Sequence, residues 1–171
     1  DNATLTSLAG QNIRFSGGLA MAAGQPLLIR TAQMQASLLT LSASGQRLAD
    51  GRAVLRGTGR HGDYGPFRFD ASLAQDGPRA TLLLDDPWPA GGLRAVRLAL
   101  APIRDGFRVE ADGQSLLGPF RGAAGLFSGG GAVRLAVERF QVAQTSLVGA
   151  LTLARGRAIG MLRLAGGGLA G

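Results

Sequence analysis

The chain has 171 residues, a formal net charge of +7 and no cysteine. The lack of cysteine excludes disulfides, thiolate metal sites and cysteine nucleophiles, and a single histidine leaves little material for histidine-based triads or metal sites. All 18 basic residues are arginines spread singly along the chain, and aromatic residues make up only 5%, so the composition disfavours nucleic-acid binding.

The dominant sequence pattern is an alternation of apolar and polar residues, which is typical of β-strands with one apolar face. Residues 30–41 contain enough Ala, Gln, Met and Leu to permit a helix, although their flanks look extended. Residues 67–73 alternate clearly, whereas any helix over residues 116–127 would be broken by Gly118, Pro119 and Gly122. Residues 132–138 and 146–153 alternate again, so we predict strands there.

Turn signals separate these runs and predict hairpins between consecutive strands. They are the dipeptides Ser44-Gly45, Asp50-Gly51, Asp76-Gly77, Asp105-Gly106 and Arg155-Gly156, together with a longer loop around residues 61–66. Short connections imply antiparallel neighbours. The pattern itself leaves two architectures open, because the apolar face is either buried in a closed β-sandwich or left open.

Few residues in the chain occur in arrangements that could support catalysis or metal binding. His61 lies near Asp63, but the surrounding glycines favour a turn, and the carboxylates of Asp85 and Asp86 precede a Pro-Trp-Pro loop rather than forming a cation site. Trp88 is expected to pack within that loop, with capping of an open end of the sheet as the alternative. The glycine-rich stretches lack the spacing of a phosphate-binding loop. We therefore expect no catalytic residue, no cofactor and no metal, and hence no enzyme.

Three stretches resemble a known family. Residues 59–67, residues 80–87 and residues 139–153 are similar to the TamB family, the translocation and assembly module proteins of the AsmA-like, bridge-like lipid transfer group. The resemblance implies an all-β fold in which an elongated antiparallel sheet curls into a groove with an apolar inner face. Because the chain begins at Asp1 and ends among glycines, we expect residues 1–171 to form one groove segment of a larger envelope protein.

The resemblance also implies a location and a function. The segment would belong to the periplasmic portion of a protein anchored in the inner membrane, and it would conduct phospholipid toward the outer membrane and support outer-membrane assembly. The expected partners are phospholipid acyl chains and, through the full-length protein, an outer-membrane barrel partner or client. An alternative is a chaperone-like module that pairs its open sheet edge with outer-membrane β-barrel or autotransporter clients.

The apolar positions of the predicted strands are the candidate lining of the lipid groove. They are Phe67, Phe69, Leu73, Leu82, Leu84, Leu98, Leu100, Val133, Leu135, Val137, Leu147, Leu151, Leu153, Leu162 and Leu164.

Overall fold

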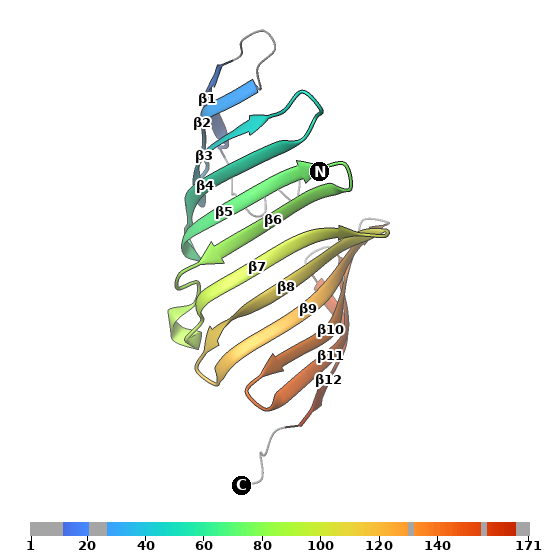
Figure 1. The fold of residues 1–171 in the computed structure, drawn as a ribbon. Coiled ribbons are helices and arrows are strands. Elements are labelled where there is room, and N and C mark those ends of the chain that lie inside the picture. The colour runs from blue at the N-terminus through green and yellow to red at the C-terminus, as the bar shows by residue number, and fades with distance from the viewer. Residues whose placement is uncertain (1–11, 21–26, 130–131, 155–156, 167–171) are drawn as a thin grey trace.

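The chain folds into one open, curled, elongated antiparallel sheet (Figure 1). The computed structural model describes residues 12–20, 27–129, 132–154 and 157–166. Within these residues, twelve strands lie side by side in chain order, and a short 3-10 helix, η1, is inserted between the sixth and seventh. The elements are β1 (Arg14–Ala20), β2 (Leu27–Gln35), β3 (Leu39–Arg47), β4 (Ala53–His61), β5 (Gly65–Ala74), β6 (Gly77–Leu84), η1 (Pro89–Gly91), β7 (Arg94–Ile103), β8 (Gly106–Ser115), β9 (Gly118–Gly129), β10 (Ala132–Val142), β11 (Thr145–Ala154) and β12 (Arg157–Ala165).

This architecture confirms the predicted fold class and decides between the two alternatives. All described strands belong to a single sheet, so no second sheet packs against its apolar face as it would in a sandwich. Each strand pairs only with its neighbours in sequence, so the sheet is a simple meander. Figure 1 shows the curl, since β10, β11 and β12 are seen nearly edge-on.

The strands form where the alternation predicts them. The predicted strands at residues 67–73, 132–138 and 146–153 lie within β5, β10 and β11. Residues 30–41, whose composition permitted a helix, form most of the β2–β3 hairpin, and residues 118–127 belong to β9. Pairing with neighbours on both sides satisfies the backbone of these segments and outweighs their weak helical preference.

Three of the predicted hairpin turns are confirmed. Asp50-Gly51 and Asp76-Gly77 connect consecutive strands with a positive φ at each glycine, and Asp105-Gly106 does so with a positive φ at the aspartate. The predicted turn at Ser44-Gly45 is wrong, because Gly45 lies inside β3 and pairs with Ile29 and Leu55. A Cβ on Gly45 would come within 3.1 Å of Leu55 Cδ1, so the glycine allows close strand packing rather than a turn. Arg155-Gly156 lies outside the described residues.

No helix in the described part of the chain is long and apolar enough to cross a membrane.

Candidate functional site

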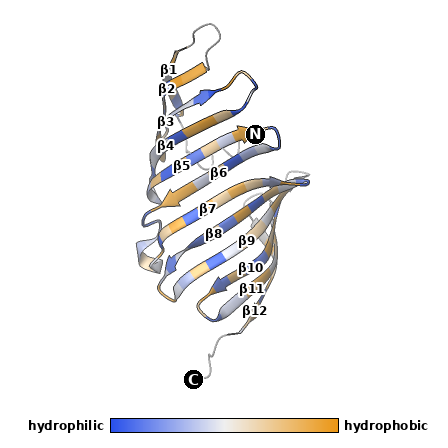
Figure 2. Cartoon of the chain, in the orientation of Figure 1, coloured by the Kyte–Doolittle hydropathy of each residue, from blue (hydrophilic) through white to orange (hydrophobic). Residues whose placement is uncertain are grey.

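One face of the sheet is apolar from β1 to β12. In an antiparallel ladder, residues directly opposite each other share a face, so the pairing partners carry that face from strand to strand. Phe67 on β5 faces Gly59 on β4 and Leu84 on β6, and Leu84 faces Val96 on β7. Figure 2 shows the resulting alternation of hydrophobic and hydrophilic residues along the strands. We call this side the apolar face and the other side the polar face.

Every candidate lining residue occupies a register position on the apolar face. Three pairs show how the strands are joined: Leu82 faces Leu98, Leu135 faces Leu151, and Leu147 faces Leu164. The full set comprises Phe67, Phe69 and Leu73 on β5, Leu82 and Leu84 on β6, Leu98 and Leu100 on β7, Val133, Leu135 and Val137 on β10, Leu147, Leu151 and Leu153 on β11, and Leu162 and Leu164 on β12. The structure thus brings them together on one surface, and their role in lipid binding stays a prediction.

The apolar face also includes β8 and β9, which sequence reasoning missed. Phe107 and Val109 on β8 face Leu126 and Ala124 on β9, and they connect the candidates on β7 with those on β10. The alternation of Phe107 and Val109 was visible in the sequence. On β9, however, glycine and alanine occupy many positions, so the alternation is not visible in the sequence. The residues of β9 on the apolar face are identified only from their pairing with β8 and β10.

A β-bulge explains why Phe140 was also missed. Strict alternation from Val137 would place Phe140 on the polar face. The register of β10 shifts between these two residues, and the extra residue returns Phe140 to the apolar face, opposite Gly122 and Leu147.

The apolar face contains all the buried apolar residues of the described chain. These are Ala43, Leu84, Val96 and Phe120, and the last three form a cluster against which Phe67, Phe140 and other residues of the same face pack. The rings of Phe120 and Phe140 stack with centroids 5.6 Å apart. Toward the last strand the face opens to solvent, since Leu164 is 73% exposed.

Four phenylalanine rings on the apolar face each lie over a glycine of the adjacent strand. Phe67 and Phe69 face Gly59 and Gly57, and Phe120 and Phe140 face Gly113 and Gly122. A Cβ on Gly57 would be 2.6 Å from the Phe69 ring, and one on Gly113 would be 2.9 Å from the Phe120 ring. The glycines therefore let the rings lie flat on the sheet, which keeps the apolar surface low and smooth.

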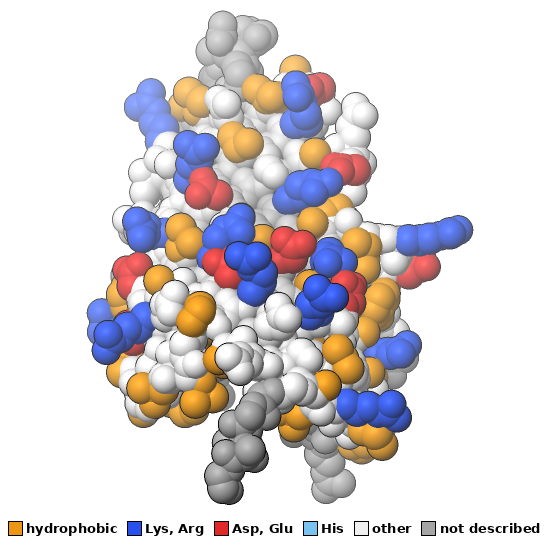
Figure 3. All heavy atoms as spheres, turned by 60° about the horizontal axis from the view of Figure 1, so that its bottom comes forward, with side chains coloured by type: hydrophobic (Ala, Val, Ile, Leu, Met, Phe, Trp, Pro, Cys, Tyr) orange, Lys and Arg blue, Asp and Glu red, His pale blue; other side chains and the backbone are white. Residues whose placement is uncertain are grey.

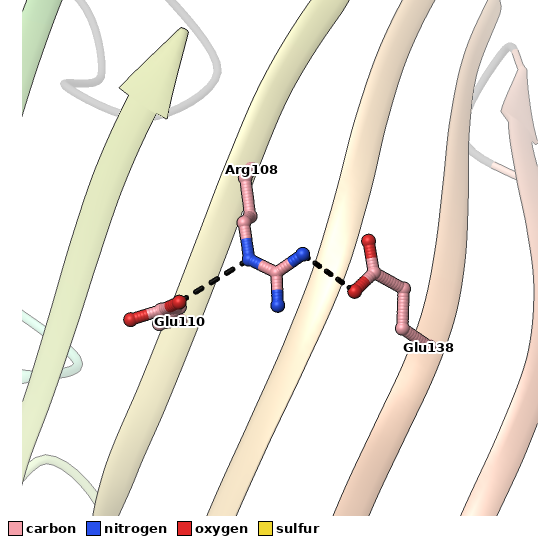
Figure 4. A network of polar contacts seen from close by, with 3 residues as sticks. All are labelled: Arg108, Glu110 and Glu138. Atoms are coloured by element: carbon pink, nitrogen blue, oxygen red, sulfur yellow. Dashed lines mark hydrogen bonds and ion pairs between the residues drawn. The ribbon is translucent and has the colours of Figure 1, made fainter. Parts of the chain in front are cut away.

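Ion pairs lie on the polar face, both within strands and between them. Arg56 pairs with Asp70 at 2.7 Å across β4 and β5. Arg108 binds Glu110 at 3.2 Å on its own strand and reaches over β9 to Glu138 on β10 at 2.7 Å (Figure 4). Figure 3 shows such basic and acidic side chains interspersed across the middle of the face in view.

A hollow of about 800 Å³ lies on the polar face over β7 to β10. It is lined mainly by charged side chains, together with the small residues Ala111, Gly122 and Ala123. Its charges are nearly balanced. They are those of Arg97, Arg108, Arg121, Arg139, Glu110, Asp112 and Glu138. Because most of these charges are already paired, the apolar face is the stronger candidate site.

The other candidate functional residues, His61 and Asp85, make local contacts that are typical of a structural role. His61 ends β4, where its Nδ1 accepts the backbone N–H of Asp63 at 3.1 Å and its ring stacks on Tyr64. Asp85 pairs with Arg68 at 3.3 Å. No three His, Asp or Glu side chains in the described part of the chain converge as metal ligands would. Trp88 lies in its loop as predicted, but its side chain is 58% exposed rather than packed away.

Two carboxylates at hairpin turns have altered acidity. The backbone N–H and guanidinium of Arg52 hold the pKa of Asp50 below its ordinary value of 3.8. The guanidinium of Arg79, which pairs with Asp76, lowers the pKa of that carboxyl in the same way. Both carboxylates lie in solvent-exposed turns, so their lowered pKa values reflect local turn structure and not a reactive site.

Comparisons with known proteins do not assign the chain to a family. No protein-family model, no curated protein and no solved structure matches the chain. Fold and geometry therefore define a class only, an open curled β-sheet with one continuous apolar face.

Proposed function

We propose that this chain binds phospholipid acyl chains along its apolar face and conducts them within the cell envelope, as a non-enzymatic periplasmic segment of an inner-membrane-anchored protein. Acyl chains would lie on the face while headgroups remain in water. The envelope location, the direction toward the outer membrane and the outer-membrane assembly role rest on the sequence resemblance to the TamB family. The lipid-binding step rests on the geometry of the sheet.

The observation that carries the proposal is the continuity of the apolar face. Following the pairing from β1 to β12, the only charged residue among the described positions of this face is Arg47, at the end of β3. Soluble proteins rarely leave a contiguous apolar surface of this extent uncovered. No described strand forms a second layer over it, so an apolar ligand is the natural occupant.

The energetics favour sliding as well as binding. Each methylene group removed from water contributes about 0.8 kcal/mol, so even part of an acyl chain is held firmly. The attraction is non-directional, and four phenylalanine rings lie over glycines of the adjacent strands, so they do not stand as obstacles on the face. A chain can therefore move from one strand pair to the next while keeping a similar number of contacts.

Two measurements on the purified protein test the proposal. Mass spectrometry of organic extracts should find co-purifying phospholipid, and the protein should accelerate transfer of a fluorescent phospholipid between donor and acceptor vesicles. A folded protein that carries no lipid and does not accelerate transfer would rule the proposal out.

A second candidate function follows from the sheet edges. Neither β1 nor β12 has a described strand on its outer side, and the edge residues Ile159 and Met161 are 73% and 67% exposed. Unprotected edges of this kind template additional strands. The chain would then act as a chaperone-like module that pairs with outer-membrane β-barrel or autotransporter clients.

Edge substitutions distinguish the two functions. Met161→Lys places a charge on β12 at a position of the polar face, paired with Ala150. It should abolish client pairing, measured by crosslinking to an unfolded outer-membrane β-protein, while phospholipid transfer remains at the wild-type rate. If transfer is lost and crosslinking persists, the edge is not the client site.

A further inference from the structure

The two rims of the sheet differ in the side chains that they expose. In a meander, alternate hairpins emerge at opposite ends of the strands. The β2–β3, β4–β5, β6–β7, β8–β9 and β10–β11 connections therefore share one rim, opposite the β3–β4, β5–β6 and β7–β8 turns. The β10–β11 turn, Ala143 and Gln144, has no large apolar side chain. Figure 1 shows η1 and the β8–β9 hairpin together on one side, with the β7–β8 hairpin on the other.

The first of these rims presents a row of large apolar side chains at its tips, which we call the apolar rim. Its members belong to four successive connections and are all solvent-exposed: Leu38 (40%), Tyr64 (51%), Trp88 (58%), Leu116 (75%) and Leu117 (76%). The described turns of the opposite rim carry charged residues instead, and the exposed large apolar side chains nearest to them, Ile103 (38%), Val54 (46%) and Leu73 (47%), lie within strands.

Backbone hydrogen bonds join the tips of the apolar rim in two pairs. The N–H of Gly62 donates to Leu38 O at 2.8 Å, which joins the β2–β3 and β4–β5 tips, and the N–H of Leu116 donates to Gly91 O at 3.4 Å, which joins the β6–β7 and β8–β9 tips. Within the β8–β9 turn, Ser115 Oγ donates to Gly118 O and accepts the N–H of Leu117, which holds both leucines outward. With strands about 4.8 Å apart, the four tips extend over roughly 29 Å.

Arginines lie within a few residues of these tips. Arg14 and Arg94 begin strands at this rim, and Arg60 and Arg121 lie within four residues of a strand end there. None of these four arginines takes part in the ion pairs found among the described residues.

Arg68, Arg97, Asp63, Asp85, Asp86 and Asp112 share this end of the sheet, where Arg68 is paired with Asp85 and Arg97 with Asp112. From β1 to β9 the six arginines at this end exceed the four aspartates, so the rim carries a small net positive charge.

We propose that the apolar rim docks onto the surface of an anionic phospholipid bilayer. Trp and Tyr favour the headgroup region, where one part of the ring is apolar and the other is wet. Leu38, Leu116 and Leu117 would enter the acyl boundary while the arginines face anionic headgroups, as in other interfacial anchors. Docking at the rim is separate from binding on the apolar face, and neither requires the other.

The fluorescence of Trp88 can report docking, because it is the only tryptophan in the chain. The full chain is titrated with vesicles of phosphatidylcholine containing phosphatidylglycerol, and with vesicles of phosphatidylcholine alone. We expect a blue shift of the Trp88 emission and quenching by brominated acyl chains, together with stronger co-sedimentation with the anionic vesicles.

Matched variants locate the contact. The double variant Leu116→Ser, Leu117→Ser changes two exposed side chains. Each of the two substitutions should weaken the affinity for vesicles about tenfold or more. Ile103→Ser makes a similar change on the opposite rim and should leave affinity unaltered. Leu151→Asp, on the apolar face, should also leave docking intact even where it impairs lipid transfer.

Three results would overturn the docking proposal: no response of Trp88 to either vesicle, wild-type affinity in the double leucine variant, or self-association through the rim without vesicle binding. Sedimentation velocity of the wild type and the double variant reveals the last of these. Lipid transfer that persists without docking would reject the rim alone, whereas docking without lipid transfer would reject the conduction function alone.

Discussion

A charge placed in the middle of the apolar face should impair lipid binding without unfolding the sheet. Leu151 lies on β11 between Leu135 and Gly160, and it is only half-buried, so part of its surface is free to cover an acyl chain. Full burial of a leucine contributes about 1.5–3 kcal/mol, and a carboxylate in its place must also be desolvated. We expect Leu151→Asp to weaken phospholipid association by about 2 kcal/mol or more, roughly thirtyfold.

The same strand offers a matched control. Val148 is 40% exposed on the polar face of β11 and faces Arg163, so Val148→Asp adds the same charge beside an existing arginine. Both variants are compared with wild type by vesicle-to-vesicle transfer of fluorescent phospholipid, with circular dichroism confirming the β-sheet. Undiminished transfer by a folded Leu151→Asp variant, or an equal loss in Val148→Asp, would refute the assignment of the lipid to the apolar face.

Three further predictions concern the sheet itself. Gly57→Ala should lower the free energy of unfolding by about 1–3 kcal/mol, because its methyl group meets the backbone oxygen of Ser42 and the Phe69 ring, whereas Gly18→Ala, with open space around it, should cost little. Because the folded-state pKa values of Asp50 and Asp76 are depressed, their ion pairs stabilise the fold above pH 3.8 and are lost as the pH falls through those lower values; an Asp50→Asn, Asp76→Asn variant should show a shallower acid dependence in urea titrations. Arg108→Gln should cost less than about 1 kcal/mol in denaturant unfolding, with a smaller effect at high salt, and leave lipid transfer unchanged.

Local rules account for most of the strands but not for all of the apolar face. The alternation in β5, β10 and β11 identifies which residues point together, and it correctly groups Phe67, Leu135 and Leu151. Alternation fails at Phe140, where the bulge in β10 reverses the phase, and it is silent on Phe120, whose neighbours are mostly glycine and alanine. Only the strand pairing recovers these two rings.

The turns show the same division. Asp-Gly dipeptides predict hairpins because these residues tolerate a positive φ, and three of them form turns. Ser44-Gly45 carries a similar local signal, yet Gly45 is needed inside β3, where Leu55 approaches closely. A local preference for turning is weak compared with the hydrogen bonds and packing of a central strand, so the tertiary context decides.

By itself, the sequence determined that the chain is all-β, antiparallel and apolar on one face of each strand, because side-chain alternation and turn chemistry act over a few residues. It did not determine whether that face is closed by a second sheet. The tertiary structure decided this, since the meander pairs every described strand with its sequence neighbours and leaves none of the described strands to form an opposing layer. It also aligned the tips of four connections into one apolar rim, a feature that depends on strand direction and register and cannot be seen in any single segment.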